Sequence, residues 1–363
     1  MAVTEQGLLA ALTSVQDPHT GQDFVSTRAL RNVQIHGGDV AFDVELGYPA
    51  KSLLPELRRS LVAAAKGVAG VENVSVNITT KVVAHAVQRG VQLLPQVKNI
   101  IAVASGKGGV GKSTTAANLA LALAAEGASV GVLDADIYGP SQPMMMGINR
   151  RPESDDGKTM EPLENYGVQV MSIGFLVDQD EAMIWRGPMA TQALEQLLRQ
   201  TNWKDLDYLI IDMPPGTGDI QLTLSQRVPM TGAVIVTTPQ DIALLDAKKG
   251  IKMFEKVGVP ILGIVENMAV HVCSNCGQVE HIFGADGGKK MAADYGMDYL
   301  GALPLDMSIR LQADSGKPTV VADPDGEVAQ IYKKVAREVA VKIARQAKDF
   351  SSKFPTISIS KNT

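Results

Sequence analysis

A glycine-rich loop with two lysines is the part of the sequence whose chemistry is clearest. Residues 106–113 read Gly-Lys-Gly-Gly-Val-Gly-Lys-Ser and fit the pattern G-x-x-x-x-G-K-[ST]. In this pattern the backbone N–H groups surround nucleotide phosphates, and the following helix adds positive potential at its N-terminus. We therefore expect Lys112 to reach the β- and γ-phosphates of ATP and the hydroxyl of Ser113 to bind Mg²⁺. The residues expected to contact the nucleotide are Gly106, Lys107, Gly108, Gly109, Val110, Gly111, Lys112, Ser113 and Thr114.

The same glycines also satisfy G-x-G-x-x-G, the pattern of dinucleotide-binding folds. In that interpretation Asp134, which ends the next apolar run, would hold a ribose. Two features favour a nucleoside triphosphate instead. One is the adjacent Lys112 and Ser113, and the other is Asp212, which directly follows the apolar run at 209–211 and has the form of a Walker-B carboxylate.

The only two cysteines, Cys273 and Cys276, form a single C-x-x-C followed by glycine. Two thiolates are too few for a metal centre, because structural zinc takes four ligands and the usual iron–sulfur clusters take four cysteines. His271 and His281 could complete a mononuclear zinc site, whereas a two-fold dimer would supply four cysteines across its interface. A thioredoxin-like redox pair and two incidental thiols are the remaining interpretations.

Secondary-structure elements must position these residues, and the sequence pattern that predicts such elements changes near residue 100. Up to about residue 90, two helical stretches, a hairpin around Gly37-Gly38-Asp39 and a further strand predict a small α+β domain. From residue 100, apolar strands alternate with helices, which predicts an α/β domain with a mostly parallel sheet covered on both faces. We expect domains at 1–90 and 100–350, a linker at 91–99 and a flexible tail at 351–363.

Composition and charge indicate a globular protein without a strongly basic surface. The 363 residues are 45% hydrophobic and 20% charged, and the formal net charge is −5. A general nucleic-acid binder would normally have a basic face, so we expect no nucleic-acid partner. No apolar run approaches the roughly 20 residues that span a bilayer, and the N-terminus lacks the basic region of a secretory signal. We expect a cytoplasmic protein without a membrane partner.

Lys107 makes the loop similar to that of a particular group of ATPases. A lysine directly after the first glycine resembles the signature lysine of the deviant Walker-A group, which includes MinD, ParA and nitrogenase reductase. The resemblance implies an ATP-sandwiched homodimer in which Lys107 contacts the partner's nucleotide and stabilises charge on the transferred phosphoryl group. It also implies that Asp136 orients the attacking water and that residues 214–219 form a nucleotide-sensitive loop. The catalytic residues expected on this basis are Lys107, Lys112 and Asp136.

A series of segments narrows the resemblance to the Mrp/ApbC family of iron–sulfur cluster carrier ATPases. The segments are residues 106–114, 134–141, 185–189, 212–219, 238–240, 266–268, 273–276 and 301–306. The resemblance implies a homodimer that binds a [4Fe–4S] cluster through Cys273 and Cys276 of both chains. With ATP and Mg²⁺, such a dimer would deliver the cluster to apo-proteins, and cluster-assembly scaffold proteins would be further partners.

The resemblance also implies roles for single residues and for the N-terminal domain. Ser113, Asp134 and Asp212 would hold Mg²⁺, and Asn267 would contact adenine. The first 90 residues are similar to small iron–sulfur assembly domains but contain no cysteine, so we expect them to dock or regulate. The rival functions are a MinD- or ParA-like positioning ATPase without a cluster and a reductase with a bridging cluster. The adjacent cysteine pair favours the carrier over both.

Overall fold

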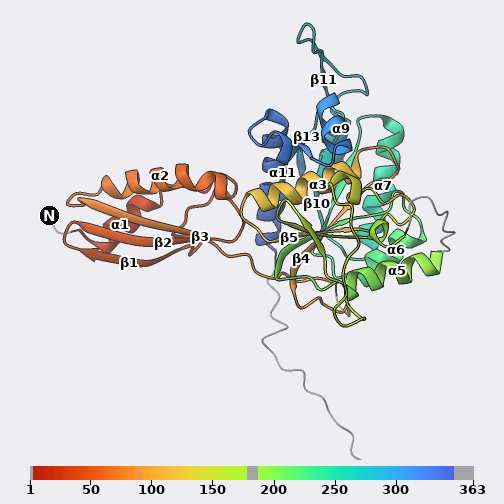
Figure 1. Cartoon of the computed structure of the whole chain (residues 1–363). Coiled ribbons are helices and arrows are strands. Elements are labelled where there is room, and N and C mark those ends of the chain that lie inside the picture. The colour runs from red at the N-terminus through yellow and green to blue at the C-terminus, as the bar shows by residue number, and fades with distance from the viewer. Residues whose placement is uncertain (1–2, 89, 178–186, 347–363) are drawn as a thin grey trace, which may run out of the picture.

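The computed structural model describes residues 3–88, 90–177 and 187–346. Figure 1 shows a small N-terminal unit that extends to one side of a larger body. The larger body contains both the glycine-rich loop and the cysteine pair.

The N-terminal unit is a three-stranded sheet with two helices on one face. Its elements are α1 (Glu5–Leu12), β1 (Leu30–His36), β2 (Asp39–Leu46), the 3₁₀ turn η1 (Lys51–Leu53), α2 (Leu54–Lys66) and β3 (Asn73–Thr80). β2 pairs antiparallel with β1 and parallel with β3. Alternate residues of β2 are buried, and Val44 is fully enclosed together with Leu8 of α1 and Leu61 of α2. This alternation is expected of a sheet that packs on one face only.

The larger body is built on an eight-stranded sheet. Its strands are β4 (Val97–Ala104), β5 (Val130–Asp134), β6 (Leu163–Asn165), β7 (Val168–Ser172), β8 (Leu206–Asp212), β9 (Gly232–Thr237), β10 (Ile261–Glu266) and β13 (Tyr299–Ala302). The spatial order is β13-β10-β9-β4-β8-β5-β7-β6, and every pair except β6–β7 is parallel. The central strands are almost entirely buried, because helices cover both faces. The predicted α/β fold class is confirmed.

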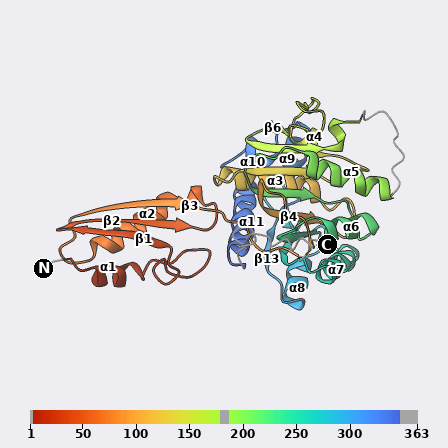
Figure 2. The same cartoon turned by 90° about the horizontal axis from the view of Figure 1, so that it is seen from below.

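Helices lie on both faces of this sheet (Figure 2). They are α3 (Lys112–Ala125), α4 (Gln142–Met145), α5 (Gly187–Gln200), α6 (Asp219–Arg227), α7 (Asp241–Lys256), α8 (Gly287–Asp294), α9 (Met307–Asp314), α10 (Thr319–Ala322) and α11 (Glu327–Ala344), with a 3₁₀ turn η2 (Ile173–Phe175). α3 packs against α11, and α5 packs against α6. Among the described residues, no helix is both long and apolar enough to cross a bilayer.

Some boundaries differ from the sequence expectation. β4 begins at Val97, inside the segment 91–99 expected to be a linker, because Val97 pairs with Leu206 at the start of β8. The sequence analysis does not predict the edge strands β6 and β13, which have only 3 and 4 residues and leave too short a pattern to recognise. The tail expected at 351–363 lies outside the described residues.

A small hairpin projects from the larger body at the top of Figure 1. Its strands are β11 (His271–Val272) and β12 (Val279–Glu280), which pair antiparallel. The connection between them holds both cysteines.

Candidate functional site

The glycine-rich loop connects β4 to α3, so its residues lie at the carboxyl edge of the parallel sheet. Gly109 and Gly111 have φ angles of 81° and 83°, a left-handed conformation that favours glycine. Gly106 is needed for a different reason, because a Cβ atom there would lie 2.1 Å from the backbone carbonyl carbon of Asp246 in α7. The loop is therefore held tightly between the sheet and α7.

Lys112 joins the loop to the carboxylates of the neighbouring strands. Its ammonium lies 2.5 Å from Oδ1 of Asp212 and 3.0 Å from the hydroxyl of Ser113. Oδ2 of Asp136 is 3.9 Å from the same ammonium. The tertiary structure thus brings together residues from α3, from the end of β8 and from the segment after β5.

Asp134, at the end of β5, is fully buried between these groups. Its carboxylate accepts hydrogen bonds from the hydroxyl of Ser172 and from the backbone N–H groups of Asp136, Ser141 and Gln142. Burial, and then the charge of Asp212, raise the pKa of Asp134 to about 7. Burial is also the main cause of the raised pKa of Asp136, whereas the ammonium of Lys112 acts in the opposite direction.

Gln142 is a site residue that the sequence analysis does not identify. Its side chain is buried, and its amide N–H groups donate to Oδ2 of Asp212 at 2.9 Å and to the backbone oxygen of Ser113 at 3.0 Å. It therefore positions one carboxylate and the first turn of α3. The segment 134–141, which resembles the carrier family, ends one residue before Gln142. The position of Gln142 directly after this segment is the feature by which the sequence could have identified it.

Three other predicted residues lie on the loop or next to it. The side chain of Lys107 is half-buried, and within the described part of the chain no carboxylate lies within ion-pair distance of it. The amide Nδ2 of Asn267, the residue directly after β10, donates to the backbone oxygen of Val110 at 2.8 Å, so Asn267 supports the loop. Thr114 is half-buried in the first turn of α3.

The donors around Lys112 suit a hard divalent cation. A hydroxyl from Ser113 and carboxylates from Asp134 and Asp212 are oxygen ligands of the kind that Mg²⁺ prefers. In the described ranges, no group of three or more His, Cys, Asp or Glu side chains could hold a metal ion by itself. In the usual P-loop arrangement, phosphate oxygens and water complete the shell of Mg²⁺.

The cysteine hairpin is a compact knuckle. The backbone N–H of Cys273 donates to the oxygen of Gln278, and the N–H of Gly277 donates back to the oxygen of Cys273. Cys273 is half-buried and Cys276 is exposed. The backbone N–H groups of Cys276 and Asn275 lower the pKa of the Cys273 thiol, which favours the thiolate that binds metals.

Each of the two histidines of the zinc hypothesis contacts a backbone oxygen through Nδ1. Nδ1 of His271 lies 3.0 Å from the backbone oxygen of Leu305, and Nδ1 of His281 lies 3.1 Å from that of Ala269. The described structure does not bring these histidines and the cysteines together as one four-ligand group. A zinc site within one chain therefore receives no support from the described residues.

The fold and the loop geometry define the class of the larger body, which is a P-loop NTPase. Residues 96–340 match the protein family described as NUBPL iron-transfer P-loop NTPase, and residues 5–78 match the family described as iron–sulfur cluster assembly protein. The chain belongs to this family of iron-transfer P-loop NTPases, and the resemblance on which the sequence analysis relied is confirmed.

Similar proteins are known from bacteria and from a mammal. An iron–sulfur cluster carrier protein of Escherichia coli K12 is 51% identical over 333 residues, which are 92% of this chain and 90% of that protein. A carrier of the same description from Pseudomonas fragi is 62% identical over 74% of this chain and 94% of its own length. The iron–sulfur cluster transfer protein NUBPL of Mus musculus is 56% identical over 67% of this chain and 77% of its own length.

Two solved structures resemble the larger body. A nucleotide-binding protein from Archaeoglobus fulgidus, in complex with ADP, has 38% identity and a TM-score of 0.56 over 64% of this chain and 90% of that chain. The cell division ATPase MinD of Pyrococcus furiosus has 23% identity and a TM-score of 0.51 over 66% of this chain and 98% of its own. At that identity the second likeness concerns the fold alone.

Proposed function

We propose that this protein is a homodimeric ATPase that carries a [4Fe–4S] cluster and transfers it to apo-proteins. The observation that carries the proposal is a knuckle with two thiols in a chain of the iron-transfer P-loop NTPase family. Relatives described as iron–sulfur cluster carrier proteins support it. The ADP complex of the Archaeoglobus protein supports the nucleotide part.

In the proposed hydrolysis, ATP and water give ADP and inorganic phosphate. Lys112 would exchange its contact with Asp212 for oxygens of the β- and γ-phosphates, while the loop N–H groups bind the same phosphates. Asp136 would orient the attacking water, and its raised pKa makes it a better proton acceptor than an ordinary carboxylate. The partner subunit's Lys107 would stabilise charge on the transferred phosphoryl group.

Mg²⁺ would be held by the hydroxyl of Ser113 and, through its water shell, by Asp134 and Asp212. When bound, it would neutralise charge on the phosphate oxygens. Gln142 would keep the carboxylate of Asp212 in place, because its amide already donates to that carboxylate. Asn267 would keep the loop closed around Val110, and its amide oxygen would face the base.

The cluster is the cargo of the proposed reaction, and two chains are needed to hold it. Cys273 and Cys276 from both chains would give the four thiolates that a [4Fe–4S] cluster takes. The exposure of Cys276 on a projecting hairpin supports this arrangement, because two such hairpins can meet across a two-fold axis. The same exposure would let an apo-protein approach the cluster.

Two rival functions use the same nucleotide site. A positioning ATPase without a cluster would leave the knuckle and the lowered pKa of Cys273 without a role. A reductase would keep its bridging cluster and pass electrons, so it would not lose iron to a recipient. Both rivals are distinguished from a carrier by following iron.

The test is anaerobic reconstitution with iron and sulfide, followed by absorption spectroscopy and metal analysis. We expect about four iron atoms per dimer. The iron should be lost in Cys273→Ala and Cys276→Ala and retained in Ser274→Ala, a matched control from the same hairpin. One zinc per chain, or no metal, would contradict the proposal. Incubating the loaded dimer with an apo-enzyme that needs a [4Fe–4S] cluster should restore that enzyme's activity, and a reductase would fail this step.

A further inference from the structure

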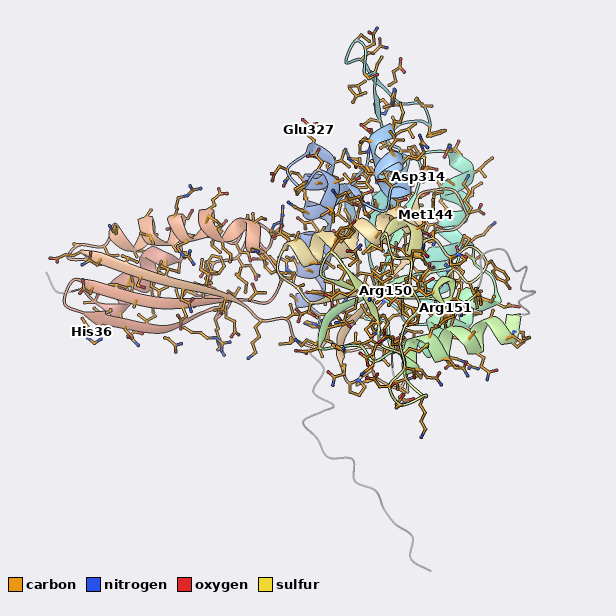
Figure 3. All side chains as sticks on the ribbon, viewed as in Figure 1. His36, Met144, Arg150, Arg151, Asp314 and Glu327 are labelled. Carbon is orange, nitrogen blue, oxygen red and sulfur yellow. The ribbon has the colours of Figure 1, made fainter. Side chains whose placement is uncertain are left out.

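The N-terminal unit meets the larger body through a polar junction at one of its ends. The junction comprises residues 17–20 and 47–52 on one side and Glu126, Arg337, Glu338 and Arg345 on the other. The opposite end of the N-terminal sheet, where Figure 3 labels His36, is far from the larger body. Among the described residues, this junction and the chain segment between β3 and β4 join the two parts.

Glu126 is the centre of the junction. Its side chain is only 1% exposed, and its carboxylate accepts hydrogen bonds from the guanidinium of Arg337 at 2.6 Å and from the hydroxyl of Ser52 at 2.7 Å. The backbone N–H of Ser52 donates to the other carboxylate oxygen at 2.9 Å, and the N–H of Lys51 donates to the backbone oxygen of Glu126. The N-terminal unit thus supplies most of the donors.

Glu126 is placed where helix electrostatics disfavour it. It directly follows α3 as its C-terminal capping residue, and the C-terminal end of a helix carries partial negative charge. A buried carboxylate is tolerated only when it is paired and hydrogen-bonded. Since neither α3 nor its own chain neighbours compensate this charge, Glu126 depends on Ser52 and Arg337.

Further polar contacts lie beside Glu126. His19 lies between two side chains of α11, with Nδ1 at 3.0 Å from Glu338 and Nε2 accepting from Arg337 at 3.2 Å. Arg345 donates to the backbone oxygen of Thr20. A cavity of about 250 Å³ remains between the two parts. An interface that holds a cavity and relies on several polar contacts allows one domain to move relative to the other.

Helix α3 connects this junction to the nucleotide site. The helix begins with Lys112 and Ser113 in the site and ends one residue before Glu126 in the junction. Its 14 residues span about 21 Å, and most of them are buried against the sheet and α11. A stiff, enclosed helix moves as one body, so a constraint on its C-terminal end also limits the positions of Lys112 and Ser113.

We propose that docking of the N-terminal unit on Glu126 sets the nucleotide affinity of the P-loop through α3. Ser52 and Glu126 are then positioning residues that act on the nucleotide through Lys112 and Ser113. This inference rests on the proposed nucleotide binding and gives the N-terminal unit a role as an internal regulator. Coupling between two binding events is reciprocal, so nucleotide binding must also change how firmly the N-terminal unit is docked.

The experiment measures both sides of this coupling in the full-length protein. The first measurement is the dissociation constant for Mg²⁺ and a non-hydrolysable ATP analogue in Ser52→Ala. Ser60→Ala, an exposed serine of α2, is the matched control, and Ser52→Thr restores the hydroxyl. The second is hydrogen exchange of the Lys51 and Ser52 amides, which donate directly to Glu126, with and without the analogue.

We expect Ser52→Ala to weaken binding about fivefold or more, because a loosened α3 holds Lys112 and Ser113 less firmly. Ser60→Ala should bind like the parent, Ser52→Thr should recover most of the affinity, and the analogue should slow exchange at Lys51 and Ser52. If Ser52→Ala binds the analogue as tightly as the parent protein, and if amide exchange at Lys51 and Ser52 does not depend on the analogue, the inference is overturned. The proposed function would then still stand. Failure of the parent to bind the analogue would overturn the proposed function and the inference with it.

Discussion

A single methyl group added to the first glycine of the P-loop should destabilise the whole larger body. In Gly106→Ala the new Cβ atom would lie 2.1 Å and 2.2 Å from the carbonyl carbon and oxygen of Asp246 and 2.5 Å from the nitrogen of Ala247. These are backbone atoms of α7, so no side-chain rotation can relieve the contact. The loop and the helix must separate by more than an ångström.

The magnitude follows from the cost of overpacking. Forcing an extra methyl group into a packed site costs about 1–3 kcal/mol, and a contact with rigid backbone belongs at the upper end. For a domain of this size, about 3 kcal/mol lowers Tm by roughly 6–12 °C. Thermal unfolding without nucleotide, followed by circular dichroism, measures the shift.

Gly108→Ala is the matched control, because Gly108 belongs to the same loop and a Cβ atom there would meet no atom within 4 Å. Its φ angle also lies outside the left-handed region that disfavours alanine. We expect its Tm to stay close to that of the parent, with a change in stability of about 0.5 kcal/mol or less. If Gly106→Ala and Gly108→Ala melt at the same temperature, the packing of the loop against α7 is not as described.

Other residues of the site give further predictions. Lys112→Ala should abolish ATP turnover, whereas Lys107→Ala should lower turnover and largely spare nucleotide binding; equal loss of both in Lys107→Ala would contradict a role across the dimer interface. Gln142→Ala should weaken Mg²⁺–ATP binding by about tenfold, because Asp212 loses a buried donor worth about 1–3 kcal/mol, and unchanged affinity by calorimetry would refute this positioning role. The pKa of Asp134 is raised from 3.8 to about 7, so the folded protein keeps a proton that the unfolded chain releases, and stability should fall as pH rises between these values. Asp134→Asn removes this titration, so its nucleotide-free Tm should change less than that of the parent between pH 5 and about 7.5; parallel Tm–pH curves would argue against the raised pKa.

The sequence alone determined the chemistry that local order encodes. The spacing of Gly106, Gly111 and Lys112 predicts a phosphate loop because the backbone turn, the lysine and the helix N-terminus are consecutive in the chain. The alternation of apolar strands with helices predicts the parallel sheet for the same reason, since each βα unit is local. The cysteine pair predicts a two-ligand knuckle, and the structure adds its hydrogen bonds.

Tertiary structure decided what depends on contacts between distant segments. Gln142 carries no motif, and it becomes a site residue only because the sheet order places β5 beside β8, which brings α4 over Asp212. Position 106 requires glycine because the backbone of α7 lies against the loop there. The contacting residue of α7, Asp246, is 140 residues away in the sequence. Short edge strands such as β13 also escape prediction, because a few residues carry too little pattern.

The tertiary structure adds most to the description of the N-terminal unit. The sequence alone predicts its small α+β fold and, because the unit contains no cysteine, a docking or regulatory role, but it does not show where the unit docks. Folding brings Ser52 onto Glu126, 74 residues apart, because a buried carboxylate at a helix C-terminus needs donors that its own helix cannot supply. Local sequence thus determined the phosphate loop. The electrostatics at the C-terminal end of α3 decided where the N-terminal unit docks on the larger body.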